Sequence, residues 1–512
     1  MNNYMSFSKS PIWDLQRRYF EEQGIEAWRD SEVPYYITNN SLLANAYVEM
    51  VFGFLKDWAR DGNDVKEPIY LLEVGGGTGR CAYFMLKSLE SLYMLTTESL
   101  PPIRYIWTDL PQKNVDFYAS HPRFATFVQN ETLDFARFDV EQDNELYLIH
   151  SKKLITTSSL TQPIIVIANY FFDSIPQDLF FFRNGQAFEC QVSLEQPEPE
   201  NTDSITESLT NLQLKYGYLR VETIDTGNHY KDQLLEEYQK QIATSHVLVP
   251  FVGFDVLERI RRFSQVGFML LSADKGPCNL QELDGLDTPK LVTHGSFSLN
   301  VNYHAMGYLY ELQQGKAHFP THKQSHLNTV CLLMVPNADA FGETRQAYAR
   351  YVDRFSPDDY FQLKKAFFRH LDHMDFHEIL SFLRLSCNDP RLYVQCLPRL
   401  LKLSSELRDA DKHTLFTLTE QVWDWYYDIG DQEDLAFLIG TLLYQMDFYE
   451  EAIEFYQNSL QKDGPLYYNM GICYYRLMKD EECLACMELS LGLDPESVDA
   501  KRIIHELERN DI

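Results

Sequence analysis

The segment with the clearest chemical signature is a glycine-rich turn, Gly75 to Gly79, which follows an apolar run ending near Glu73. Glycines at such a turn allow a ligand to lie against the backbone, and the helix predicted to follow offers free N–H groups. The P-loop requires Lys and then Ser or Thr after its last glycine, whereas Arg80 and Cys81 follow here. The dinucleotide pattern G-x-G-x-x-G fails because its last position is Arg80. The pattern that fits is an acid, any residue, and then three glycines at alternate positions.

This spacing resembles motif I of class I S-adenosylmethionine (SAM) methyltransferases. The resemblance implies SAM as the cofactor and assigns its binding to one acid and four glycines: Glu73, Gly75, Gly76, Gly77 and Gly79. SAM has no phosphate, and a carboxylate at a strand end suits its cationic amino-acid group. Asp109, which ends the next apolar run, is expected to accept hydrogen bonds from the ribose hydroxyls. Asp139 lies where this fold usually places a residue beside the adenine, although a solvated strand end is an equal alternative.

A second segment narrows the family. Ile167 to Pro176 (IANYFFDSIP) resembles the ANEFFDALP signature of MidA-like SAM-dependent methyltransferases, the group that contains the mitochondrial complex I assembly arginine methyltransferase. The segments at Tyr36–Thr38, Gly267–Gly276 and His294–Tyr303 resemble further blocks of this family in the same order. The resemblance covers roughly residues 11–310 and implies an arginine side chain as the methyl acceptor.

The sequence departs from the family in two blocks, one of which reads Asn300-Val301-Asn302 where the family usually carries an acidic residue. The family's Asn-Glu pair is Asn169-Tyr170 here, and the resemblance assigns Asn169 to both cofactor binding and catalysis. A protonated guanidinium is a poor nucleophile, so its methylation calls for carboxylates that orient it and disperse its charge. Asp173 and Glu189 remain as candidate catalytic acids. Three hypotheses stay open: an arginine methyltransferase, a methyltransferase for a small molecule or another nucleophile, and a SAM-binding assembly or scaffold protein without catalysis.

A parallel sheet is expected to position these segments. The candidate strands are short runs that are apolar at nearly every position: Ile69–Val74, Ile103–Thr108, Ile164–Ala168, Gly267–Ser272 and Thr329–Val335. Such runs suit strands buried on both faces, and their alternation with helical segments predicts a Rossmann-like α/β domain. Helices are predicted over about Pro11–Glu22 and Ser41–Arg60. The acidic, proline-rich stretch 195–211 is predicted to be a mobile surface loop.

Beyond about Asn337 the pattern is helical and contains a repeat. Six positions recur with a shift of 31 residues: Ala436, Ile439, Gly440, Leu443, Ala452 and Tyr456 correspond to Tyr467, Met470, Gly471, Tyr474, Cys483 and Met487. This resembles the tetratricopeptide repeat, whose usual period is 34, and its small residues mark where antiparallel helices approach closely. Cys483 and Cys486 form a C-x-x-C without a second pair, which favours core packing over a metal site.

The predicted architecture therefore has three parts. Residues 1–65 form a helical cap, residues 66–340 a class I methyltransferase domain, and residues 356–512 an all-α helical-repeat domain with tetratricopeptide-like units at about 433–495.

Charge and composition limit the partners. The 512-residue chain has a net charge of −30, which argues against nucleic acid and anionic membranes as partners. No run of about 18 apolar residues is present, and nine scattered cysteines favour a cytoplasmic location. Residues 431–512 contain 18 acidic and 6 basic residues. A solvated surface is the simplest interpretation, but on a repeat domain this charge also predicts docking of a protein partner or substrate with a basic segment.

Overall fold

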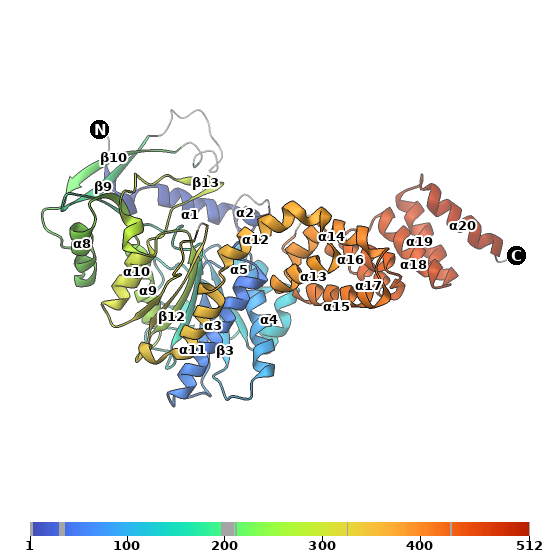
Figure 1. Cartoon of the computed structure of the whole chain (residues 1–512), viewed down its shortest axis with the longest axis horizontal. Coiled ribbons are helices and arrows are strands. Elements are labelled where there is room, and N and C mark those ends of the chain that lie inside the picture. Colours follow the sequence, from blue (N-terminus) through green and yellow to red (C-terminus); the bar gives the residue numbers. More distant parts are fainter. Residues whose placement is uncertain are drawn as a thin grey trace. The chain divides into compact units, whose positions relative to one another are not determined.

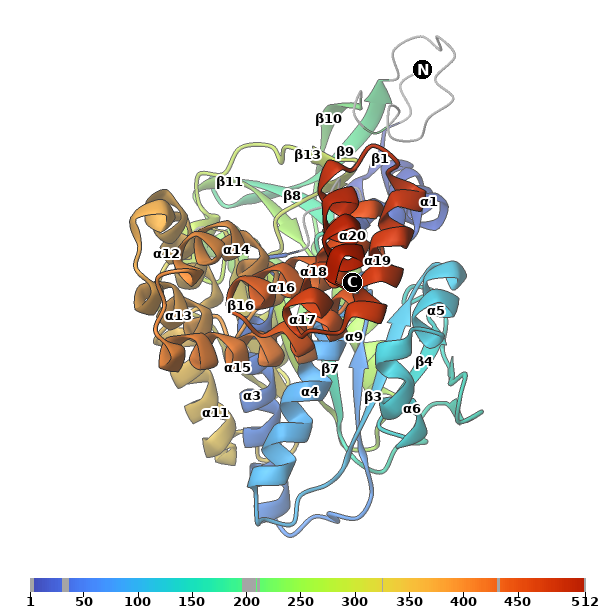
Figure 2. The same ribbon diagram turned by 90° about the vertical axis from the view of Figure 1, so that its right-hand side faces the viewer.

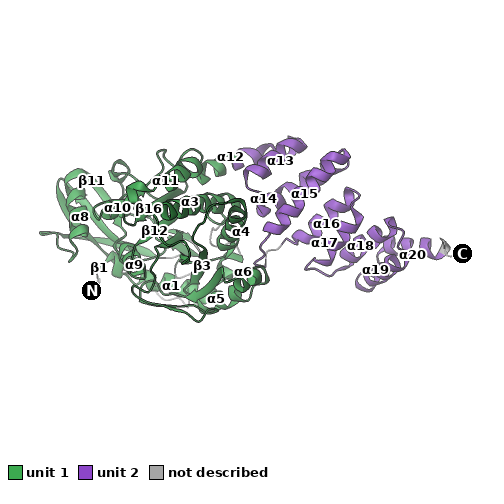
Figure 3. Ribbon diagram, turned by 90° about the horizontal axis from the view of Figure 1, so that it is seen from below, with its two compact units in different colours: residues 1–363 green, residues 364–512 purple. Residues whose placement is uncertain are grey.

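The structure, a computed structural model, describes residues 4–29, 36–195, 209, 212–324, 326–430 and 433–510. The chain forms two compact units, Met1–Leu363 and Lys364–Ile512, which Figure 3 shows in different colours. All strands of the described residues lie in the first unit, and the described part of the second unit is helical. The predicted fold class is confirmed, because a Rossmann-like α/β domain precedes an all-helical region. Within the described residues, no helix is both long and apolar enough to span a bilayer.

A seven-stranded sheet forms the centre of the first unit. In spatial order its strands are β15 (Lys316–His318), β16 (Asn328–Met334), β12 (Phe268–Asp274), β7 (Ile164–Asn169), β2 (Ile69–Glu73), β3 (Ile103–Asp109) and β4 (Leu133–Arg137). The strands from β12 to β4 are parallel, and β16 runs antiparallel to both of its neighbours. Every predicted apolar run lies in this sheet, and β2, β7 and β12 are buried on both faces as expected.

Helices cover both faces of this sheet (Figure 1). One face carries α3 (Ser41–Arg60), α4 (Arg80–Leu95) and α11 (Gly342–Tyr348), and the other carries α9 (Phe251–Arg261) and α10 (Tyr303–Glu311). Helix α3 lies between α4 and α11 and is buried along most of its length (Figure 2). The carboxylate of Asp57 on α3 accepts hydrogen bonds from the backbone N–H groups of Glu343 and Thr344 at 3.1 and 2.8 Å. The predicted helix Ser41–Arg60 is confirmed, and this cap on α11 holds the two helices together.

A second, antiparallel sheet lies where the sequence predicted no strands. It contains β1 (Met5–Ser6), β9 (Gln186–Glu195), β8 (Asp178–Arg183) and β11 (Thr244–Val249) in this order, with β10 (Gln213–Arg220) also paired to β9. A tight turn at Asn184 and Gly185, both with positive φ, joins β8 to β9. The predicted mobile loop at 195–211 falls almost wholly outside the described residues.

The remaining elements of the first unit are short or peripheral. They are α1 (Ile12–Gln23), α2 (Glu26–Arg29), α5 (Gln112–Ala119), α6 (Ala125–Gln129), α8 (His229–Gln241), the pair β5 (Leu146–Tyr147) and β6 (Leu154–Ile155), and the pair β13 (Val292–His294) and β14 (Ser296–Ser298). Helix α1 was predicted, and it begins and ends within one residue of the expected bounds.

The second unit is a succession of helices. They are α13 (Phe376–Leu385), α14 (Pro390–Ser404), α15 (Asp409–Trp425), α16 (Leu435–Gln445), α17 (Tyr449–Gln457), α18 (Gly464–Arg476), α19 (Asp480–Leu493) and α20 (Val498–Asn510), while α12 (Pro357–His370) begins in the first unit. The 31-residue repeat corresponds to two successive helix pairs, α16–α17 and α18–α19. Cys483 and Cys486 are buried in the helix packing, as predicted.

Glycine permits close helix contact at equivalent positions of the two pairs. A Cβ on Gly440 would lie 2.7 Å from two ring carbons of Tyr456, and a Cβ on Gly471 would lie 2.7 Å from the terminal methyl of Met487. Both distances are too short for carbon atoms. The ring of Tyr456 is rigid, so α16 and α17 approach closely because Gly440 lacks a side chain, whereas the terminal methyl of Met487 ends a flexible side chain that can move. Tyr456 and Met487 are also related by the repeat.

We expect Gly440→Ala to lower the free energy of unfolding by about 1–3 kcal/mol, because the added methyl group overpacks the contact with Tyr456. The matched control is Gly492→Ala on α19, where a Cβ would meet nothing within 4 Å. This change should stabilise the chain by a few tenths to about 1 kcal/mol through helix propensity. Urea denaturation of the full chain measures both effects, and a stabilising Gly440→Ala would contradict the packing argument.

Candidate functional site

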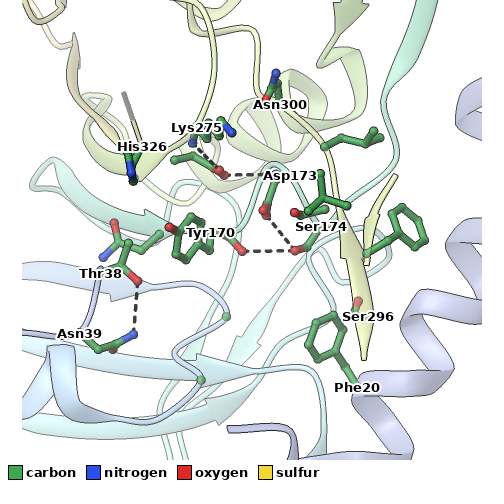
Figure 4. Close-up of a pocket in the computed structure, with 18 of the residues that line it drawn as sticks. Phe20, Thr38, Asn39, Tyr170, Asp173, Ser174, Lys275, Ser296, Asn300 and His326 are labelled. Carbon is green, nitrogen blue, oxygen red and sulfur yellow. Dashed lines mark hydrogen bonds between the residues drawn. The ribbon is translucent and has the colours of Figure 1, made fainter. Parts of the chain in front are cut away.

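A cavity of about 460 Å³ opens at the carboxyl ends of the central strands (Figure 4). The strand order reverses here, because β3 and β4 lie on one side of β2 while β7 and β12 lie on the other. Open α/β sheets bind their ligands at such a switch point. Six of the predicted site residues line this cavity: Glu73, Gly75, Gly76, Gly77, Asn169 and Asp173. Four others, Gly79, Asp109, Asp139 and Glu189, do not line it.

The glycine-rich turn connects β2 to α4 in a conformation that favours glycine. Gly75, Gly77 and Gly79 have φ values of +63°, +54° and +71°. Gly76 packs against the indole of Trp107, where a Cβ would lie 2.0 Å from Nε1, and its N–H donates to the carbonyl of Thr108 at 2.8 Å. The alternate glycines are therefore required by the turn itself, and Gly76 is required by the neighbouring strand β3.

Glu73 ends β2 as a buried carboxyl that faces the cavity. Its Oε2 accepts a hydrogen bond from the hydroxyl of Tyr105 at 3.0 Å. Burial, reinforced by the charge of nearby Asp109, raises the pKa of Glu73 to about 8. A buried acid with this pKa is neutral in much of the free protein at pH 7 and is ready to ionise beside a cation.

Asp109 lies at the equivalent position of the next strand, β3. Its two carboxylate oxygens accept hydrogen bonds from the N–H of Leu110 at 2.8 Å and from Nδ2 of Asn114 at 3.0 Å. Burial raises the pKa of Asp109 to about 6 in spite of these hydrogen bonds and one from the backbone of Gly77. Asp109 thus lies directly behind the glycine-rich turn, which is compatible with the ribose contact predicted for it.

Asp139 forms an ion pair with Arg17 of helix α1. Partial burial would raise the pKa of Asp139, but the hydrogen bond and charge of Arg17 outweigh it and hold that pKa below its usual value. Its Oδ1 also accepts from the N–H of Glu141 at 3.2 Å. The adenine contact predicted for Asp139 stays a prediction, because in this structure its carboxylate anchors α1.

Asn169 ends β7, and its side chain is engaged by the protein. Its Oδ1 accepts hydrogen bonds from the hydroxyl of Tyr47 at 2.6 Å and from the N–H of Ala273 at 3.1 Å. Its Nδ2 lies 3.8 Å from Sγ of Cys81 on α4. Asn169 therefore connects β7 with β12, α3 and α4 at the floor of the cavity.

Two buried carboxyls, Asp173 and Asp274, lie together in the cavity wall. The N–H of Asp173 donates to Oδ2 of Asp274 at 3.3 Å, and the hydroxyl of Ser174 donates to Oδ1 of Asp173 at 2.8 Å (Figure 4). Burial raises the pKa of both acids, and the neighbouring charge of Asp173 raises that of Asp274 further. Such a pair offers a binding position for a cation that carries several N–H donors.

The sequence did not single out Asp274, although a signal for it exists. Asp274 is the last residue of the buried strand β12, as Glu73 is of β2 and Asp109 of β3. The shared sequence signal is an acidic residue directly at the end of an apolar run. The aromatic residues Phe20 and Trp28 also line the cavity without any local sequence signal.

Glu189, the other predicted catalytic acid, lies on β9 of the second sheet. It pairs in register with Phe180 of β8 and Leu219 of β10 and is only partly buried. The structure does not bring it to the cavity with Asp173, so its catalytic role stays a prediction without support from its position.

Similarity to known proteins is distant. No protein-family model matches the chain, and no curated protein matches it. An uncharacterised protein from Burkholderia thailandensis aligns with a TM-score of 0.40 at 11% identity, over 66% of this chain and 90% of that one. A member of the same superfamily from that organism, bound to S-adenosyl-homocysteine, aligns with a TM-score of 0.41 at 11% identity over the same shares. The CurJ carbon methyltransferase aligns with a TM-score of 0.25 at 12% identity, over 56% of this chain and 54% of that one. Likeness at this level assigns neither a ligand nor an activity to this chain.

Proposed function

We propose that this chain is a SAM-dependent methyltransferase that acts on an arginine side chain of a protein. The observation that carries the proposal is the strand–turn–helix at the sheet's switch point, where a buried acid, Glu73, and left-handed glycines at 75 and 77 face one cavity. The residue types of the turn suit a ligand with a cationic amino-acid group and no phosphate, and the motif resembles that of class I methyltransferases.

The residues present fit SAM. The turn brings backbone close to the cavity without side chains, Glu73 supplies a carboxyl for the ammonium group, and Asp109 lies behind the turn for the ribose. When bound, SAM supplies an electrophilic methyl group. The protein's own work is to hold the acceptor in line with that group and to exclude water.

The pair Asp173 and Asp274 supports a guanidinium acceptor. A guanidinium presents several N–H donors in one plane and is matched by carboxylate oxygens. The pair supplies two acids, which compensates for the family's glutamate that is Tyr170 here. The acceptor nitrogen must lose a proton as it gains the methyl group, and a carboxylate whose pKa is raised by burial is a better base near neutral pH.

Calorimetric titration with S-adenosylhomocysteine tests the cofactor assignment. We expect the wild-type chain to bind one equivalent and to transfer labelled methyl groups to arginine in a protein substrate. Absence of binding would overturn the proposal. Binding without methyl transfer to any protein in a lysate would favour the non-catalytic SAM-binding alternative.

Binding should depend on pH through Glu73. Its pKa is about 8 in the free protein, and a bound ammonium group stabilises the carboxylate, so binding releases a proton and affinity falls as pH drops below 8. We expect the affinity for S-adenosylhomocysteine to fall about tenfold between roughly pH 8 and pH 6.5. Glu73→Gln cannot ionise and should flatten this slope. A variant with the wild-type slope would show that another group carries the linkage.

We further propose that the second unit recruits the protein substrate or a partner through a basic segment. Acidic residues at exposed positions of α17 and α19 support this, among them Glu450, Glu454, Asp480, Glu481 and Glu482. Charge-steered association weakens steeply as salt is raised.

The test of this recruitment neutralises three adjacent acids on α19, Asp480→Asn, Glu481→Gln and Glu482→Gln. We expect severalfold weaker capture of an arginine-rich peptide and a reduced salt dependence, with the affinity for S-adenosylhomocysteine unchanged. Capture that is insensitive to both salt and neutralisation would leave these acids as solvated surface.

A further inference from the structure

Two aromatic side chains from the N-terminal helices form part of the cavity wall. Phe20 of α1 and Trp28 of α2 both line the cavity. Their rings are stacked, with centroids 6.1 Å apart and planes inclined by 21°. The indole of Trp28 also lies against the glycine-rich turn, because a Cβ on Gly77 would be 3.4 Å from Cζ2 of the ring. The ring of Trp28, stacked on that of Phe20, thus adjoins the turn that the cofactor is proposed to occupy.

Several contacts hold helices α1 and α2 beside the cavity. Arg17 pairs with Asp139, two residues beyond the end of β4, and Nζ of Lys113 on α5 donates to the carbonyl of Glu22. The guanidinium of Arg29 lies 5.2 Å from the ring centroid of Phe117, also on α5. These contacts tie α1 and α2 to the elements that follow β3 and β4, and Nε2 of Gln16 on α1 also donates to the carbonyl of Phe297 on β14 at 2.6 Å.

The acceptor carboxyls are placed by strands on one side of β2. Asp173 follows β7 and Asp274 ends β12, and both strands lie across β2 from β3 and β4. Asp109, at the end of β3, lies on the other side of β2 from these two acids. The cavity lining therefore contains two chemically different parts: Asp173 and Asp274 offer paired carboxyls for a cation, and Phe20 and Trp28 offer aromatic rings, while Asp109 lies behind the turn.

We propose that Phe20 and Trp28 form the surface on which the adenine ring of the bound cofactor stacks. This inference rests on the proposed binding of SAM and adds two cofactor-binding residues from outside the sheet. A purine presents a flat, weakly hydrated face, and aromatic side chains bind such faces without regard to ring substituents. The sulfonium group and the transferred methyl are not involved, so SAM and S-adenosylhomocysteine should depend on the pair equally.

The test compares Trp28→Ala, Phe20→Ala and Trp28→Phe in calorimetric titrations with SAM and with S-adenosylhomocysteine. We expect Trp28→Ala to weaken the binding of both ligands by about 10- to 100-fold, which is the range for loss of one base-stacking contact, and Phe20→Ala to weaken the binding of both in the same direction. Trp28→Phe preserves an aromatic face and should stay within about threefold of the wild type. Ligand binding should also quench tryptophan fluorescence in the wild type, and this quench should be clearly smaller in Trp28→Phe, where Trp107 beside Gly76 is the tryptophan that remains at the turn.

The possible outcomes separate the inference from the function it rests on. A wild type that binds neither ligand would defeat the proposed function itself. A wild type that binds, with Trp28→Ala within twofold of it, would overturn the stacking surface alone. A loss for SAM that is much larger than for S-adenosylhomocysteine would instead place the rings against the sulfonium cation. If Trp28→Ala melts at a lower temperature, the affinity of Trp28→Phe and its fluorescence response decide the question.

Discussion

Gly77→Arg is expected to abolish binding of S-adenosylhomocysteine while the protein stays folded. Gly77 lines the cavity, has a φ of +54°, and faces Trp28 across 3.4 Å from the position of a Cβ. An arginine side chain there must fill the space between the turn and the aromatic wall. We expect at least a 100-fold loss of affinity, or about 2.7 kcal/mol, measured by calorimetry.

Gly77→Arg both strains the backbone and fills the cavity. A substitution at Gly62 serves as the control for backbone strain alone. Gly62 has a φ of +77° and nothing within 4 Å of a Cβ. Gly62→Arg therefore incurs a comparable left-handed strain of about 1 kcal/mol with no steric contact near the site. It should lower the melting temperature slightly and leave the affinity within about twofold. Normal binding by Gly77→Arg would show that the ligand does not occupy the turn.

The second large effect is expected for the acceptor side. Asp173→Asn should lower turnover by about 100-fold or more while the affinity for S-adenosylhomocysteine changes less than about threefold. The charge is lost where the acceptor is proposed to bind, after strand β7 and not in the glycine-rich turn that follows β2, and the amide preserves the side chain's shape. Asp274→Asn should also lower turnover, because the Asp274 carboxylate lies beside Asp173 and accepts a hydrogen bond from its N–H. Turnover and affinity are measured on the same preparations.

Glu189→Gln is the matched neutralisation of an acid outside the cavity lining. Since Glu189 lies on β9 of the second sheet, we expect wild-type turnover and affinity. If Asp173→Asn reduces affinity and turnover equally, Asp173 belongs to the cofactor site or to the core. If Glu189→Gln alone is inactive, the acceptor binds on the second sheet instead.

The sequence predicted the parts of the fold whose signal is local. Strands β2, β7 and β12 are buried on both faces, so their sequences are apolar throughout and their ends can be read directly. The glycines at 75, 77 and 79 follow from a left-handed turn, which few other residue types tolerate. Glu73 was found through its spacing to these glycines, and Asp109 as the acid that ends the next apolar run.

The second sheet escaped prediction because its strands are not apolar throughout. No position of strand β10 is fully buried, and its partner β9 lies across the 195–211 stretch of the chain. The hairpin of β8 and β9 did carry a turn signal at Asn184 and Gly185. Hydrophobic periodicity alone could not assign these strands to a separate sheet.

The sequence analysis missed several residues of the cavity for a related reason. Phe20 and Trp28 reach the cavity because Arg17 pairs with Asp139, 122 residues further along the chain. Asp173 and Asp274 are similarly brought together across 101 residues by the parallel pairing of β7 and β12. Contacts between residues more than 100 positions apart depend on the order of the strands and on where the helices pack. The hydrophobic periodicity of a single segment does not predict either of these.

The cap that Asp57 places on α11 has a consequence for synthesis of the chain. Asp57 and Thr344 are separated by 287 residues, and Gly53 on the same helix lies against the backbone of Glu343. At about 5–20 residues per second, ribosomes need roughly 15–60 seconds to produce the intervening chain. During that interval the apolar side of α3 that α11 later covers has no native partner on the nascent chain. Chaperone contact with this segment is therefore expected early in translation, and it should end once α11 leaves the exit tunnel.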